Sequence, residues 1–274
     1  MMTGLRAELI GVAGVLERNL YLTKRYLWWE VAFFVWTVAN TLTIVFIAEG
    51  IEASGGSIDV NRVTTQLLIG AVIWAYLGII FEFLTETVAW ERWEGTIEYT
   101  FMAPLSRAAH LAGMTMHAVL YGLIRAVLLF AVVALFFDLS MPQANFAAAL
   151  VVILVASVSF AGIGMMTAVL PLISPEKGTQ LGFVAQGMML VVSGVYYPVE
   201  VLPGWMQWIA TISPATYALS GSRDAILDGA GLSSMGPELL ALTVIGLVSL
   251  PIGLALFAAG ERYAKQHGKL KRSG

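Results

Sequence analysis

Between two long apolar runs, residues 90–107 read WERWEGTIEYTFMAPLSR. The chain as a whole is 58% hydrophobic and only 12% charged, which sets it apart from soluble domains. A membrane-spanning helix needs about 20 apolar residues to cross roughly 30 Å of hydrocarbon. By that criterion the sequence predicts six spans, near residues 31–48, 66–90, 111–137, 147–170, 179–197 and 238–259. We therefore expect an all-α integral membrane protein, in which residues 90–107 connect the second span to the third.

The basic residues indicate the orientation, because positive charge resists translocation across the membrane. If the N-terminus is cytoplasmic, twelve of the 15 Lys and Arg residues fall in cytoplasmic segments. The outer segments contain Arg62 and Arg223, and Arg125 falls within the third span. This distribution predicts that both termini and residues 90–107 lie on the cytoplasmic side.

Residues 1–30 predict a cytoplasmic amphipathic helix that ends in an aromatic pair, Trp28 and Trp29. Its apolar side contains Leu5, Leu9, Val12, Ala13, Leu16, Leu20 and Leu27. Such a helix lies on the inner surface of the membrane, and anchoring alone would explain it. Residues 31–259 are then the six-span domain, and residues 260–274 are a basic cytoplasmic tail.

The outer segment 198–237 is too apolar for a solvated loop and is divided by Pro198, Pro203 and Pro214. A helix between Pro203 and Pro214 would be about 15 Å long, too short to cross the membrane. Helix ends at membrane depth are tolerated only where they pack against protein or face water. We therefore expect two short re-entrant outer helices between spans five and six, the second from about residue 216 to residue 227.

Four ionisable residues fall within the predicted spans, where such groups are costly and usually functional. They are Glu82 and Glu86 in the second span and His117 and Arg125 in the third. Glu82 and His117 have similar predicted depths and are expected to pair. Arg125 lies nearer the midplane and needs another acceptor, for example in a partner chain. The group is either a polar clamp between the two spans, or a substrate site or gate.

Signatures of catalysis are missing from the sequence. There is no G-x-S-x-G or H-E-x-x-H motif, and Gly268-Lys269 lacks the remainder of a phosphate-binding loop. The chain has no cysteine, and its three histidines are scattered. We expect no catalytic residue, metal site or cofactor in this chain, and no nucleic-acid partner.

Residues 90–107 have two interpretations. Trp90, Trp93, Ile97, Tyr99 and Phe101 alternate with Glu91, Glu94 and Glu98. This alternation predicts a short helix with apolar anchors and an acidic face, which suits docking into a cleft of a soluble partner. The plainer interpretation is a solvated charged loop.

Three features together resemble the permease subunits of type-2 ABC exporters. The first is the pair of motifs ERWEGTIE at 91–98 and APLSR at 103–107. The second is the C-terminal series SGVYYP at 193–198, LPGWMQ at 202–207, SPATY at 213–217 and Arg223. The third is the set of six spans with cytoplasmic termini and an amphipathic N-terminal helix.

The resemblance implies a subunit of the bacterial plasma membrane that exports a lipophilic or amphipathic molecule such as a drug, lipid, antibiotic or glycoconjugate. It implies pairing with two ATP-binding subunits, which hold the ATP and magnesium, and with a second permease that is an identical chain or a paralogue. Membrane lipid surrounds both permeases. By the resemblance, ATPase coupling involves Glu91, Trp93, Glu94, Gly95, Thr96 and Glu98. An outer gate involves Tyr196, Tyr197, Pro198, Pro203, Trp205, Pro214 and Tyr217.

Two other classes of function stay open at this point. In an ion-coupled secondary transporter, Glu82, Glu86 and His117 would form a proton relay. A membrane scaffold or biogenesis factor would need no nucleotide-binding partner. In the exporter, the methionine-containing span five around Gln186 is a candidate pathway wall, because methionine adapts to varied ligands. The small residues of span four favour close helix packing.

Overall fold

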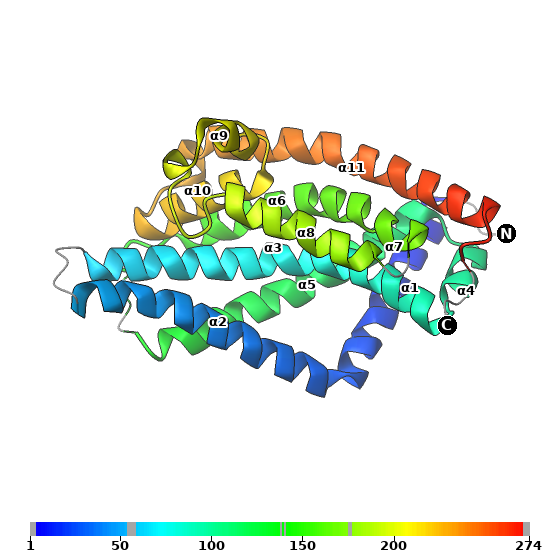
Figure 1. The fold of residues 1–274 in the computed structure, drawn as a ribbon, viewed down its shortest axis with the longest axis horizontal. Helices are drawn as coiled ribbons and strands as arrows, with labels where there is room; N and C mark the ends of the chain where they lie inside the picture. The colour runs from blue at the N-terminus through cyan, green and yellow to red at the C-terminus, as the bar shows by residue number, and fades with distance from the viewer. Residues whose placement is uncertain (1–3, 54–58, 138, 140, 175–176, 271–274) are drawn as a thin grey trace.

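A computed structural model describes residues 4–53, 59–137, 139, 141–174 and 177–270. Throughout these residues the chain is helical and contains no strand, so the all-α prediction is confirmed (Figure 1). Residues Lys271 and Arg272 of the predicted basic tail lie outside the described part of the chain.

Within the described residues, five helices are long and apolar enough to cross a membrane. They are α2 (Leu27–Ala53), α3 (Val60–Glu94), α5 (Arg107–Ala134), α6 (Phe146–Thr167) continued by α7 (Val169–Ile173), and α11 (Gly236–Gln266). The predicted fifth span corresponds to α8 (Gly178–Val192), which has only 15 residues. It is about 22 Å long, shorter than the hydrocarbon layer. The prediction of six full spans is therefore not confirmed by helix length.

The chain turns away from the α8 axis just beyond Val192. Gly194 has a left-handed φ of 69°, a conformation that glycine adopts without a side-chain clash. The guanidinium of Arg223 donates hydrogen bonds to the carbonyl oxygens of Gly194 and Val195, at 3.0 and 2.5 Å. This turn explains why the apolar run of residues 179–197 is not one helix.

Two short helices follow the turn, as the prolines predict: α9 (Gly204–Ala210) and α10 (Pro214–Leu227). α10 begins at Pro214 rather than near residue 216, because proline fits the first turn of a helix. Its residues Ala215, Ala218 and Leu219 are buried, against α6, α3 and α11.

α3 is the central helix, with α2, α5, α6, α8 and α10 packed around it. At 35 residues it is about 52 Å long, well over the roughly 30 Å of hydrocarbon. The small residues of span four pack closely, as predicted: a Cβ added to Gly253 of α11 would lie 2.5 Å from the carbonyl oxygen of Gly162 in α6. Ser159 also donates a hydrogen bond of 2.7 Å to the Leu242 carbonyl oxygen.

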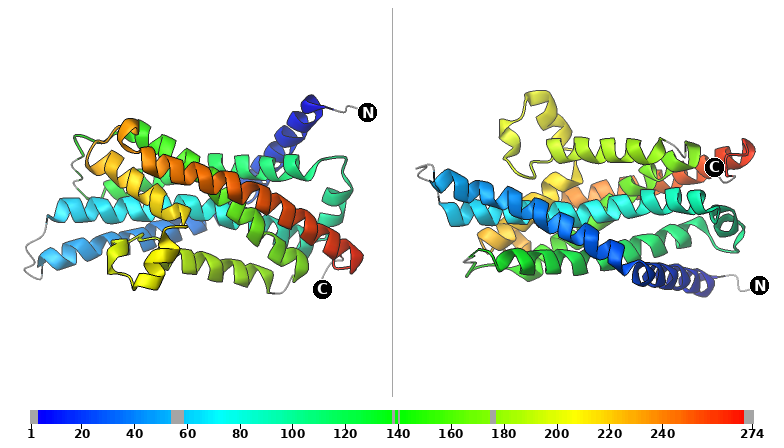
Figure 2. Two further views of the ribbon diagram at one scale, coloured as in Figure 1. Left: turned by 90° about the horizontal axis from the view of Figure 1, so that it is seen from above. Right: turned by 60° about the horizontal axis from the view of Figure 1, so that its bottom comes forward.

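The N-terminal helix α1 (Leu5–Arg25) ends five residues earlier than predicted, and α2 begins at Leu27. α1 packs on α5 at Gly113, where an added Cβ would lie 2.7 Å from Val15. Leu5, Leu9 and Leu20 remain exposed. Figure 2 shows α1 beside the bundle, at the end that carries α4. The predicted apolar side of α1 therefore faces outward and is available to a membrane surface.

Candidate functional site

The segment predicted to dock a partner forms an elbow between α3 and α5. α3 continues without a break to Glu94, so residues 90–94 are its last turn and not part of a separate helix. Gly95 ends α3 with a φ of 79°, and the N–H of Thr96 donates a 2.9 Å hydrogen bond to the Glu91 carbonyl oxygen. This is the glycine-dependent helix end of the Schellman type. The short helix α4 (Ile97–Met102) follows at once.

The apolar side chains of the elbow divide between two sides. Ile97 and Phe101 are buried in the bundle, where Phe101 makes an edge contact with Phe257 at 6.4 Å between ring centroids. The prediction that both anchor a partner is therefore wrong. Trp93 and Tyr99 are 63% and 73% exposed. We call the surface formed by Trp93, Glu94, Glu98, Tyr99 and Met102, all exposed, the elbow surface.

Glu91 does not belong to the elbow surface, although the resemblance included it among the coupling residues. Its side chain is buried, and its carboxylate oxygen lies 2.6 Å from a guanidinium nitrogen of Arg18. This ion pair connects α1 to the end of α3. A carboxylate in this position stabilises the base of the bundle and leaves no exposed face for a partner.

Arg92 connects the elbow to two other parts of the chain. It is 2% exposed and donates hydrogen bonds to the carbonyl oxygens of Pro171 and Leu172, at 2.9 and 2.6 Å. It also donates to the carbonyl oxygen of Lys269 in the C-terminal segment. Sequence analysis missed this role. A signal was available, because a guanidinium between two residues of a motif is a strong multiple donor.

Arg107, the first residue of α5, connects the elbow to α11. Its guanidinium lies 2.7 Å from the Glu261 carboxylate and donates a 2.7 Å hydrogen bond to the carbonyl oxygen of Phe101. Glu261 in turn lies 2.6 Å from the Lys265 ammonium. Glu261 was also missed, because nothing in the sequence indicates that the two residues are neighbours.

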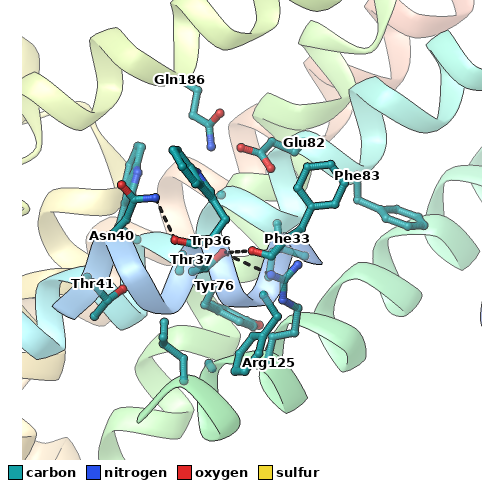
Figure 3. A pocket seen from close by; sticks show the side chains of 18 of the residues that line it. Phe33, Trp36, Thr37, Asn40, Thr41, Tyr76, Glu82, Phe83, Arg125 and Gln186 are labelled. Atoms are coloured by element: carbon teal, nitrogen blue, oxygen red, sulfur yellow. Dashed lines mark hydrogen bonds between the residues drawn. The ribbon is translucent and has the colours of Figure 1, made fainter. Parts of the chain in front are cut away.

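A second candidate site is a cavity of about 590 Å³ between α2, α3, α5 and α8 (Figure 3). Both intramembrane glutamates line it, together with the basic residue Arg125. Other polar and aromatic residues of the lining include Glu30, Phe33, Trp36, Thr37, Asn40, Thr41, Trp74 and Gln186. The cavity thus combines charged, amide and aromatic groups within the apolar part of the bundle.

Arg125 finds its acceptor within this chain, so the expected need for a partner's acceptor is wrong. A guanidinium nitrogen lies 3.9 Å from the Glu30 carboxylate, and the guanidinium donates to the hydroxyls of Tyr121 and Thr37 at 3.2 and 3.3 Å. Tyr121 donates to Glu30 as well. Glu30, at the start of α2, could not be placed opposite Arg125 from sequence spacing.

His117 does not pair with Glu82, contrary to the prediction. Its Nε2 lies 3.1 Å from the hydroxyl of Thr23 in α1, and its ring contacts Phe83 at 4.7 Å between centroids. No hydrogen bond or ion pair joins it to Glu82 among the residues that the structure describes. The depth estimate was reasonable, but α1 covers the side of α5 on which His117 lies.

The predicted outer gate residues mainly hold their own turns. Tyr197 donates a 2.5 Å hydrogen bond to the Val191 carbonyl oxygen, and Tyr217 donates one of 2.7 Å to that of Thr211. Pro203 and Pro214 precede or open the short helices. Trp205 is exposed. Tyr196 differs from the others, because it also lines the cavity.

The charged residues do not form a metal centre in the part of the chain described. Within it, no group of three or more His, Cys, Asp or Glu side chains could hold an ion.

Comparisons with known proteins give one family and two relatives. The family model described as ABC-2 type transporter matches residues 19–227. The linearmycin resistance permease protein LnrN of Bacillus subtilis (strain 168) is 29% identical over 192 residues, which cover 68% of this chain and 47% of the relative. ABC transporter G family member 20 of Dictyostelium discoideum is 30% identical over 116 residues, 42% of this chain and 16% of the relative. The chain thus matches less than half the length of either relative.

Proposed function

Because the chain belongs to the ABC-2 type transporter family, we propose that it is the permease subunit of an ATP-driven exporter. It is a multi-pass membrane protein, and the substrate of the exporter is a lipophilic or amphipathic molecule. The membrane is the plasma membrane of a bacterium, and both termini are cytoplasmic. The family supports a separate ATP-binding subunit as the source of energy, with the ATP and magnesium held there.

One observation supports this proposal most directly. The elbow surface is exposed, whereas the buried side chains next to it in the elbow form hydrogen bonds and ion pairs with the other helices of the bundle. Arg92 joins the end of α3 to the α7 region and the C-terminal segment. Arg107 joins α4 and α5 to α11. A displacement of the elbow surface by a bound partner therefore moves several helices together, which a rigid-body transition requires.

The complete transporter contains two copies of the ATP-binding subunit and a second permease, either an identical chain or a paralogue. In this arrangement α8 and the two outer helices together make the fifth crossing, with α9 and α10 entering from the outside. α1 lies on the inner membrane surface, and residues 260–270 lie on the cytoplasmic side. The relative from B. subtilis is named for resistance to linearmycin, which supports export of a small molecule.

An ion-coupled transporter is the weaker proposal. Its relay would pass protons between Glu82, Glu86 and His117, yet His117 bonds to Thr23 and is fully buried. Glu82 and Glu86 line a cavity that His117 does not. His117 is therefore not placed to exchange protons with Glu82 and Glu86, as a proton relay would require.

The test is reconstitution of the full chain with the ATP-binding subunit that co-purifies with it from its native host. Glu98→Lys and Tyr99→Ala should each reduce co-purification, because both side chains belong to the elbow surface. Phe136→Ala removes an equally exposed aromatic side chain at the opposite end of α5 and should leave co-purification unchanged. Uptake driven by a pH gradient without ATP would contradict the proposal.

A further inference from the structure

We propose that the cavity between α2, α3, α5 and α8 binds the headgroup of a positively charged amphiphile, such as an alkylammonium compound. The inference rests on the proposed function, because it names the class of molecule that the exporter carries. It is argued from the charge, the aromatic lining and the open side of the cavity.

The cavity has more negative than positive side chains. Arg125 pairs with Glu30 at 3.9 Å. Among the described residues neither Glu82 nor Glu86 forms an ion pair with a basic side chain, although the charge of Arg125 also acts on Glu82. Glu86 lies close enough to Glu82 and Glu30 for the three carboxylates to repel one another when ionised. An ionised carboxylate at membrane depth needs a compensating cation. A ligand's ammonium group supplies that cation.

The aromatic residues suit the same ligand. Trp36 and Phe33 are exposed at the side of the cavity, at 69% and 57%, and Trp74 lines its wall. Aromatic faces attract ammonium groups, tryptophan most strongly, and they also accept an alkyl chain. The lining therefore offers places for both the charged head and the apolar tail.

A buried polar group without a partner indicates that the cavity is built for a ligand and is not a packing defect. Thr41 is only 3% exposed and lines the cavity, yet its hydroxyl makes no hydrogen bond to any described residue. Gln186 points from α8 towards the Glu82 carboxylate (Figure 3). Gly78 provides the room, because a Cβ there would lie 2.8 Å from the Gln186 amide nitrogen.

The arrangement of the helices leaves a side of the cavity open. α2 and α8 both pack on α3, but neither packs extensively on the other. α3 therefore forms the floor of a groove between them, at the level of Glu82. An amphiphile dissolved in the membrane can enter such a groove sideways, head first, without crossing the bundle.

The chain has no cysteine, so one introduced thiol can report on the cavity. Asn40→Cys places it beside Thr41, and the full chain is assembled with its partner subunits in nanodiscs. Methanethiosulfonate reagents carrying a trimethylammonium, a sulfonate or a neutral group are compared by their modification rates. We expect the cationic reagent to react roughly tenfold faster than the anionic one, because three carboxylates and only one basic side chain line the cavity.

Glu82→Gln and Glu86→Gln should each bring the two rates closer together, since each removes one negative charge without changing the side-chain shape. Ser233→Cys, on an exposed turn near α11, is the control, and its rates should not respond to either substitution. Dodecyltrimethylammonium should slow modification of Asn40→Cys by the neutral reagent at least severalfold. Dodecyl sulfate, with the same alkyl chain, should not.

Equal rates for the two charged reagents, or protection by both detergents alike, would overturn the inference. So would complete resistance of Asn40→Cys to all three reagents, which would mean that a second copy of the chain covers the cavity. None of these measurements needs ATP. Loss of cation preference with intact ATP-driven transport would therefore contradict the inference and leave the proposed function standing.

Discussion

The guanidinium of Arg92, in the last turn of α3, lies 2.6 Å from the carbonyl oxygen of Leu172 in α7. A buried side chain at the elbow thus holds the segment that leads into α8, one wall of the cavity. The two candidate sites share this connection. A movement of the elbow therefore reaches α8 through Arg92, in addition to the parts of the cavity wall that α3 and α5 themselves form.

Arg92→Lys should separate binding of the ATP-binding subunit from transport. A lysine ammonium is a point donor and cannot reach three carbonyl oxygens from one position. Buried acceptors left unpaired cost about 1–3 kcal/mol each. We expect a Tm lower by several degrees, retained co-purification and strongly reduced ATP-driven transport. Arg262→Lys, on the exposed side of α11, is the control, and equal effects of both substitutions would contradict the role of Arg92.

The ion pair of Arg107 with Glu261 should contribute measurably to stability. Both side chains are largely buried, at 21% and 9% exposure. Removal of Glu261 leaves the Arg107 charge unpaired, and removal of Arg107 leaves Glu261 with Lys265 as its one remaining basic partner among the described residues. Arg107→Met and Glu261→Gln should each cost about 1–3 kcal/mol, and the double variant less than their sum. Denaturant unfolding in a mild detergent measures this coupling.

The same cycle on Arg62 and Asp228 provides the comparison. That pair has a similar distance of 3.0 Å, but its side chains are about half exposed. Exposed pairs contribute roughly 0–1 kcal/mol. A coupling as large in this outer pair as in the inner one would show that burial is not the cause.

Gly95→Ala should disturb the elbow through its backbone. The φ of 79° at Gly95 costs an alanine roughly 1 kcal/mol or more. We expect reduced co-purification of the ATP-binding subunit and a lower Tm. Gly187→Ala is the matched control, because no atom lies within 4 Å of its added Cβ and its φ is not positive. An alanine there should be neutral or slightly stabilising.

The sequence was sufficient for the features that depend on local pattern. Apolar runs identified the long helices, prolines placed α9 and α10, and the charged segment after span two was recognised as an elbow. These signals lie within short windows.

The remaining features depend on which helices pack against each other. The distribution of apolar and charged residues along the sequence contains little information about contacts between distant helices. Arg125 was assigned no acceptor because Glu30 is distant in the chain and lies at the start of another helix. His117 was paired with Glu82 by depth alone, whereas α1 covers His117. Ile97 and Phe101 were interpreted as anchors for a partner because exposed and buried apolar residues look alike in a sequence. The predicted length of the fifth span was also wrong. α8 ends at Val192 because the chain turns at Gly194, where Arg223 donates a hydrogen bond to the carbonyl oxygen.

Glu82→Gln should change transport and His117→Ala should lower stability. This difference distinguishes a substrate-binding residue from a residue that makes a structural contact. Glu82 faces the cavity, so its neutral isostere should change export of a cationic substrate while Tm and assembly stay the same. His117 is fully buried against Thr23 and Phe83, so truncation leaves a space and an unpaired hydroxyl. A cost of about 2 kcal/mol or more is expected. A proton relay would require both variants to lose transport with unchanged stability, and thermal unfolding beside ATP-driven transport decides between these outcomes.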